Sequence, residues 1–130
     1  MKKTKEVKDG ANLGELVNYH WDTIKERCGY KTGFKSKEKA VKHWSQQIGE
    51  IKNVKTLLQE GENKIIRFET KSHYPMYLLM KGDKVVNTGF IYDGEGESVN
   101  EKRGLVTATG HETVMNFWID DLSVEKRYTR

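Results

Sequence analysis

The chain has very little cysteine and no long apolar run. Cys28 is the only cysteine, which excludes an intrachain disulfide and is compatible with a reducing compartment. No window approaches the roughly 18 consecutive apolar residues of a membrane helix, and no apolar run follows the N-terminal lysines as it would in a signal peptide. We therefore expect a cytoplasmic protein that does not engage a membrane.

Motifs for metals and cofactors are missing as well. The four histidines have neither HxxxH nor HxH spacing: His20, His43, His73 and His111. A zinc site would require three or four ligands to converge from distant elements. The acidic segment after Asp93 has carboxylates at alternate positions, but Ser98 and Gly104 stand where a calcium loop needs a glycine and a bidentate glutamate. The sequence predicts no metal and no cofactor.

Positive charge is concentrated in the first half of the chain. Residues 1–60 contain 13 Lys and Arg against 8 Asp and Glu, whereas residues 61–130 contain 10 against 11. A one-sided positive field raises encounter rates with nucleic acid or with acidic protein surfaces. The length suits one domain of ordinary size. We expect a flexible basic arm over residues 1–10 and a single domain over residues 11–130.

The apolar pattern before residue 51 predicts two helices. The first extends from Leu13 to Cys28, where apolar residues recur every three or four positions after the capping residue Asn12. The second begins after Ser36, a favoured N-cap, and ends near Ile51. Residues 54–58 fit either a further helical turn or a first strand.

After Gly61 the pattern changes to strands and hairpins. Alternation over residues 64–70 predicts a half-buried strand, and turn residues at 81–84 and 110–112 predict two hairpins. The polar segment Asp93–Gly104 is the longest irregular piece and by its form a candidate binding loop. The predicted fold is α+β, with two N-terminal helices packed on an antiparallel sheet of five to six strands.

Two runs interleave cations with flat side chains, a pattern typical of phosphate contact combined with base stacking. The candidate binding residues are Tyr30, Lys31, Phe34, Lys35, Lys37, Lys39, Arg67, Lys71 and Tyr74. We expect a small non-enzymatic binding protein that engages nucleic acid or a nucleic-acid-handling protein. Its basic helical half and the 93–104 loop would form the binding surface.

Two other functions are compatible with the sequence. One is a small inhibitor or adaptor that acts on a protein partner. The other is a ribonuclease-type enzyme, because small toxins of the barnase and RelE type also place helices ahead of an antiparallel sheet. In that case Glu69 would be the base, His73 the acid, and Arg67 and Lys71 the phosphate contacts.

The C-terminal string Phe117–Val124 is similar to the closing strand of carbohydrate-binding jelly rolls over these eight residues. A jelly roll consists of strands throughout, whereas the first fifty residues of this chain predict two helices. We therefore assign the sequence to no family.

Overall fold

The computed structural model describes residues 7–21, 36–70, 75–91 and 94–128. The fold is α+β, with two helical segments before two four-stranded antiparallel sheets. The helical elements are α1 (Leu13–Tyr19), α3 (Lys37–His43) and the π-helical turn η2 (Trp44–Ile48). The strands are β1 (Lys52–Glu60), β2 (Asn63–Glu69), β3 (Met76–Lys81), β4 (Lys84–Phe90), β5 (Gly96–Asn100), β6 (Leu105–Gly110), β7 (Thr113–Trp118) and β8 (Val124–Tyr128).

The prediction of one sheet with five to six strands is wrong. The strands form two meanders, with the order β1-β2-β3-β4 in the first sheet and β5-β6-β7-β8 in the second. Both predicted hairpins are present, as β3–β4 and β6–β7. Alternation of side chains identifies a strand but not the sheet that it joins, because sheet membership depends on contacts distant in sequence.

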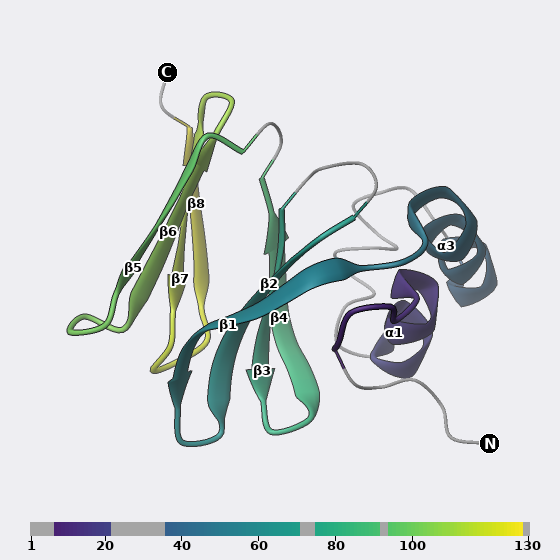
Figure 1. Cartoon of the computed structure of the whole chain (residues 1–130), viewed down its shortest axis with the longest axis horizontal. Coiled ribbons are helices and arrows are strands. Elements are labelled where there is room, and N and C mark those ends of the chain that lie inside the picture. Colours follow the sequence, from purple (N-terminus) through teal and green to yellow (C-terminus); the bar gives the residue numbers. More distant parts are fainter. Residues whose placement is uncertain (1–6, 22–35, 71–74, 92–93, 129–130) are drawn as a thin grey trace.

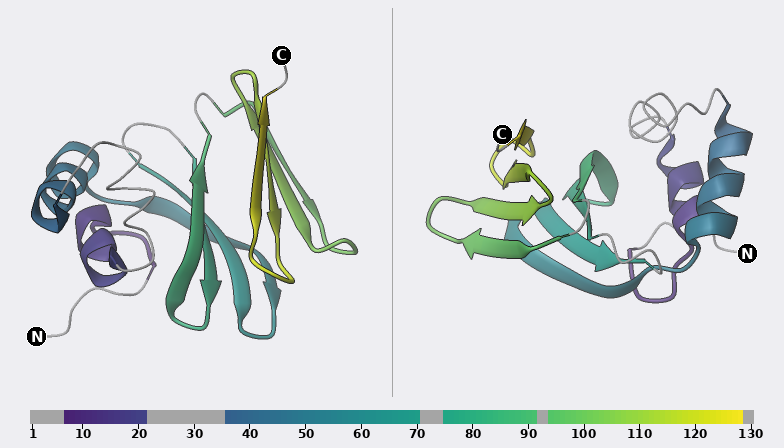
Figure 2. Two further views of the ribbon diagram at one scale, coloured as in Figure 1. Left: turned by 180° about the vertical axis from the view of Figure 1, so that it is seen from behind. Right: turned by 90° about the horizontal axis from the view of Figure 1, so that it is seen from above.

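The three layers are the helices, the first sheet and the second sheet, in that order (Figures 1 and 2). One apolar cluster joins α1 and the segment around Ile51 to the first sheet through Ile66, Phe68 and Leu78. A second cluster joins the opposite face of that sheet to the second sheet, with Tyr77 stacked on Phe117 at 4.5 Å between ring centroids. The first sheet is therefore covered on both faces, and the strand that was predicted to be half-buried over residues 64–70 packs Ile66 and Phe68 on one face and Ile65 on the other.

The first helix begins as the sequence predicts but is shorter. The side chain of Asn12 accepts a hydrogen bond of 3.2 Å from the backbone N–H of Glu15, which confirms the N-cap. The helix ends at Tyr19, with His20 as its C-cap, and residues 22–28 of the predicted helix lie outside the described residues. Gly14 lies against η2, so closely that a Cβ there would collide with the side chain of Ser45.

The second helix begins at its predicted cap but stops earlier than predicted, since η2 ends at Ile48 and the predicted end was near Ile51. Ser36 Oγ accepts a hydrogen bond of 3.3 Å from the backbone N–H of Lys39. The α-helix then widens into η2 and stops at Gly49, which has a φ of 74°, a conformation that glycine adopts without steric cost. Ile51 lies beyond the helix, is fully buried, and exchanges backbone hydrogen bonds with Gly10 and Ala11.

Two segments that the sequence left ambiguous or irregular are edge strands. Residues 54–58 belong to β1, which carries a register shift after Lys52 and a positive φ of 57° at Asn53. The predicted 93–104 loop is not irregular from residue 96 onward, because Gly96–Asn100 forms β5 and residues 101–104 form a turn. All five residues of β5 are exposed, so no apolar alternation marked it.

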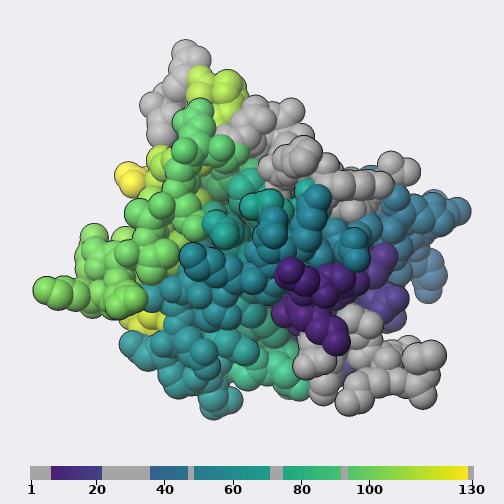
Figure 3. Space-filling view, in the orientation of Figure 1, coloured from purple at the N-terminus to yellow at the C-terminus, as the bar shows by residue number. Residues whose placement is uncertain are grey.

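The β1–β2 hairpin forms the centre of one face of the molecule (Figure 3). The second sheet lies on one side of it, and the segment around α1, with α3 beyond, lies on the other. Near its start, β1 is held by the N-terminal segment, since the backbone N–H of Val54 donates to Asp9 Oδ1 at 2.8 Å. On this face, edge strand β1 thus lies between the helical layer and the second sheet.

Candidate functional site

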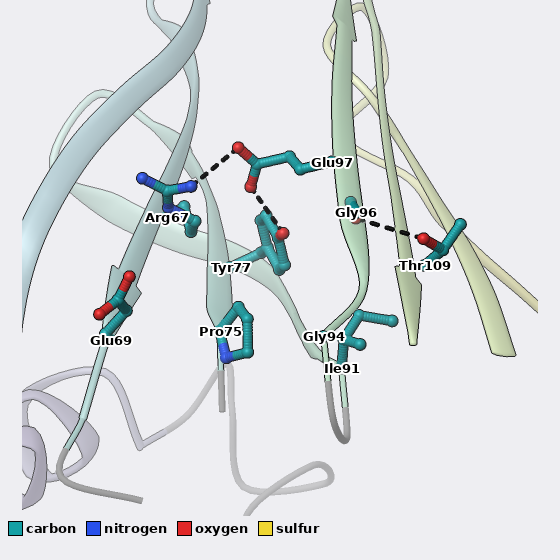
Figure 4. A pocket seen from close by; sticks show the side chains of 9 residues that line it. All are labelled: Arg67, Glu69, Pro75, Tyr77, Ile91, Gly94, Gly96, Glu97 and Thr109. Carbon is teal, nitrogen blue, oxygen red and sulfur yellow. Dashed lines mark hydrogen bonds and ion pairs between the residues drawn. The ribbon is translucent and has the colours of Figure 1, made fainter. Parts of the chain in front are cut away.

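A pocket of about 180 Å³ opens where the end of the first sheet meets β5 (Figure 4). Strands β2 and β3, together with the segments just before β3 and just after β4, form one side, and β5 and β6 form the other. The lining residues are Arg67, Glu69, Pro75, Tyr77, Ile91, Gly94, Gly96, Glu97 and Thr109. The pocket therefore exists only when the two sheets are packed together.

A chain of hydrogen bonds crosses the pocket from one sheet to the other. Arg67 Nη1 donates to Glu97 Oε1 at 2.9 Å, and the hydroxyl of Tyr77 donates to Glu97 Oε2 at 2.7 Å. The side chains of Arg67 and Glu97 are 24% and 21% exposed, so water screens this ion pair only in part. Both carboxylate oxygens of Glu97 are thereby engaged within the protein.

The phenol of Tyr77 has a pKa well above the ordinary value. Burial of the ring is the largest cause, and the hydrogen bond to Glu97 and its negative charge act in the same direction, while Arg67 opposes them. The hydroxyl consequently stays protonated, and remains a donor to Glu97, at alkaline pH values where an exposed tyrosine would ionise.

Two side chains of the pocket have hydrogen-bonding capacity that the bonds to Glu97 do not use. Arg67 uses only Nη1 for Glu97, and its Nε, which is buried, has no acceptor among the residues that the structure describes. Glu69 accepts one hydrogen bond, of 3.1 Å, from the side-chain amide of Asn53. Since residues two apart point to the same face of a strand, Arg67 and Glu69 place donors and an acceptor side by side.

Two lysines of edge strand β1 flank the pocket. The antiparallel register places Lys55 opposite Arg67 and Lys52 opposite Glu69. Residues directly opposite each other in an antiparallel pair project to the same face, so Lys55 lies on the pocket side of the sheet. Both lysines are exposed and neither forms an ion pair within the described ranges. The rim is therefore cationic, although the pocket holds one Arg and two Glu side chains.

The structure describes only some of the predicted site residues. Lys37 and Lys39 lie in α3, and Arg67 and Glu69 line the pocket. The others lie outside the described residues: Tyr30, Lys31, Phe34, Lys35, Lys71, His73 and Tyr74. Of the charge on residues 1–60, the described part holds six Lys and five Asp and Glu, so most of the positive excess belongs to residues 1–6 and 22–35.

Sequence reasoning missed Tyr77 and Glu97 as pocket residues. They lie 20 positions apart in the chain and meet only across the sheet interface. It also missed Lys52 and Lys55, which are three positions apart and reach the same face of the sheet only because the register shifts between them.

Comparison with protein-family models, with curated proteins and with solved structures found no match. Over residues 7–21, 36–70, 75–91 and 94–128, no group of three or more His, Cys, Asp and Glu side chains could hold a metal ion. The helices within these ranges are too short or too polar to cross a membrane.

Proposed function

We propose that this protein is a small non-enzymatic binding protein that engages nucleic acid, directly or through a protein that handles it. A path of unpaired lysines supports this proposal. None of the five has a carboxylate partner within the part of the chain that the structure describes: Lys37, Lys39, Lys42, Lys52 and Lys55. They follow one another from α3 into β1, which leaves the helical layer and crosses the front of the molecule (Figure 1).

Unpaired lysines suit a polyanion for a physical reason. Each phosphate that a lysine neutralises releases condensed counterions, so affinity depends steeply on salt concentration. A lysine already paired with a carboxylate would gain less, because the pair would have to be broken first. The basic residues of 1–6 and 22–35 add sequence charge of the same sign to this half of the chain.

The ribonuclease alternative retains one supporting observation. Arg67 and Glu69, the proposed phosphate contact and base, line the same pocket. Against it, Glu97 already neutralises Arg67 at 2.9 Å, and a phosphate would have to compete with that carboxylate. The proposed acid, His73, lies outside the described residues.

The protein-inhibitor alternative gains support if a tight partner binds with little dependence on salt.

The test is the affinity of labelled single-stranded RNA, single-stranded DNA and duplex DNA at about 50 and 200 mM salt, with RNA integrity followed in the same samples. We expect binding without cleavage that weakens steeply with salt. Replacing Lys52 and Lys55 by Gln should lower the salt slope by about one for each phosphate that these lysines neutralise. Lys81 and Lys84, exposed at the opposite end of the sheet, provide the matched double substitution that should change little.

Absence of binding at low salt would contradict direct binding of nucleic acid and direct the search to a protein partner. RNA cleavage that disappears in Glu69→Gln would instead support the enzyme.

A further inference from the structure

The pocket differs in charge from its rim, and this difference restricts what each can bind. Inside, Arg67 is matched by Glu97, and Glu69 adds a further negative charge. A phosphate placed there would face an uncompensated carboxylate in a partly desolvated site, which is unfavourable. The group that enters the pocket should therefore be neutral or weakly polar. Phosphates are favoured only at the rim, beside Lys52 and Lys55.

The available hydrogen-bonding groups restrict the ligand further. Glu69 can accept from a ligand, and the Nη protons of Arg67 that Glu97 does not use can donate to it. A matching ligand must carry donors and acceptors at neighbouring positions on its perimeter. Nucleobases have such edges, and in guanine two adjacent donors suit a carboxylate while O6 and N7 accept from arginine.

The size and the walls of the pocket agree with a flat ring. The cavity measures about 180 Å³, and Pro75 and Ile91 supply apolar surface. The backbone approaches closely at Gly94, where a Cβ would lie 2.9 Å from Pro75 Cγ. A base can enter such a pocket only when it is unpaired and unstacked, as in single-stranded loops and ends.

We propose that this pocket accepts one unpaired nucleobase, guanine most tightly, while Lys52 and Lys55 contact the phosphates beside it. This inference rests on the proposed function, because it assigns the base-reading site of the same nucleic-acid interaction. Phosphate contacts supply affinity without sequence information, and contacts to a base edge supply discrimination. The pocket and the β1 lysines divide these two tasks between adjacent residues of β2 and β1.

The experiment uses the full chain and short single-stranded oligonucleotides, in RNA and in DNA form, that differ at one position: guanine, adenine, cytosine, a pyrimidine without an amino group, or an abasic sugar. We expect the guanine oligonucleotide to bind about tenfold more tightly than the abasic one, as expected for a well-paired base edge. Glu69→Gln should reduce that ratio to about threefold or less, with the abasic affinity unchanged. The Lys55→Gln control should weaken all oligonucleotides similarly and preserve the ratio.

The outcomes separate this inference from the proposed function. Equal affinity of the wild-type protein for guanine and abasic oligonucleotides overturns the base pocket and leaves phosphate-driven binding in place. A guanine preference that survives Glu69→Gln in a folded protein shows that the base lies elsewhere and also overturns the assignment. Failure of every oligonucleotide to bind at low salt overturns the base pocket together with direct binding of nucleic acid. Because the wild-type comparison needs no variant, the test holds even if Glu69→Gln does not fold.

Discussion

The hydroxyl of Tyr77 donates a hydrogen bond of 2.7 Å to Glu97 Oε2, and this bond links inner strand β3 of one sheet to edge strand β5 of the other. Tyr77 is 1% exposed, so when its hydroxyl is removed, water cannot fully replace the hydrogen bond to Glu97. We expect Tyr77→Phe to lower the free energy of unfolding by about 1.5–3 kcal/mol, as for hydrogen bonds to charged groups. Urea denaturation measures this change.

The control for this substitution is Tyr128→Phe. Tyr128 lies on β8 and is 69% exposed, so its hydroxyl is hydrated in both states. Its loss should change stability by less than about 0.5 kcal/mol. Equal effects of the two substitutions would show that the bond between Tyr77 and Glu97 does not stabilise the sheet interface.

Alkaline pH should destabilise the protein through the same tyrosine. The pKa of Tyr77 is raised in the folded state, so the phenol ionises near its ordinary value of 10.0 only after unfolding. The stabilisation is therefore complete below about pH 10 and decreases above it, by up to about 1.4 kcal/mol per pH unit. Unfolding free energies between about pH 9 and 11 should fall more steeply for wild type than for Tyr77→Phe. Identical slopes would contradict this assignment.

The contact between α1 and η2 should not tolerate a side chain at position 14. A Cβ on Gly14 would collide with the side chain of Ser45 and lie 2.7 Å from its backbone nitrogen. Alanine favours helix by about 1 kcal/mol over glycine, but we expect Gly14→Ala to destabilise the protein by a net 1–3 kcal/mol, roughly the cost of overpacking. Glu15→Ala, exposed on the same helix, should cost less than about 1 kcal/mol. A Gly14→Ala protein as stable as wild type in thermal unfolding would refute the close approach.

The interface between the sheets has a similar restriction at Gly89. A Cβ there would lie 2.7 Å from Phe117 Cε1 and 2.9 Å from Met115 Cε. Gly89→Ala should lower the free energy of unfolding by about 1–3 kcal/mol, whereas Val86→Ala, 44% exposed on the same strand, should have little effect. Adding Phe117→Leu to Gly89→Ala should recover part of the loss in a double-mutant cycle. Strict additivity would place the two residues out of contact.

Local signals in the sequence were sufficient for the helix starts. Asn12 and Ser36 cap their helices through bonds to residues three positions away, so the sequence contains the whole interaction. The end of the second helix was misplaced because the apolar stripe continues to Ile51, although Gly49 has already turned the chain. Strand β5 has no buried residue, so its pairing with β6 leaves no pattern in its own composition.

The site was predictable only where its residues are neighbours in the chain. Arg67 and Glu69 share a strand face two positions apart, which the alternation of β2 indicates. Glu97 reaches Arg67 across 30 positions, and no local pattern specifies how one sheet lies on the other. The sequence could thus nominate one wall of the pocket but not the pocket.

The order of strands in the two meanders has a consequence for synthesis. The chain completes β1–β4 before it reaches β5. Neighbouring strands in that first sheet are also consecutive in the chain. As the protein leaves the ribosome, the first sheet can form while Ile65, Tyr77 and Leu79 still lack the sheet that covers them. That apolar face stays open to water, and to chaperones, until residues 96–128 emerge and close over it.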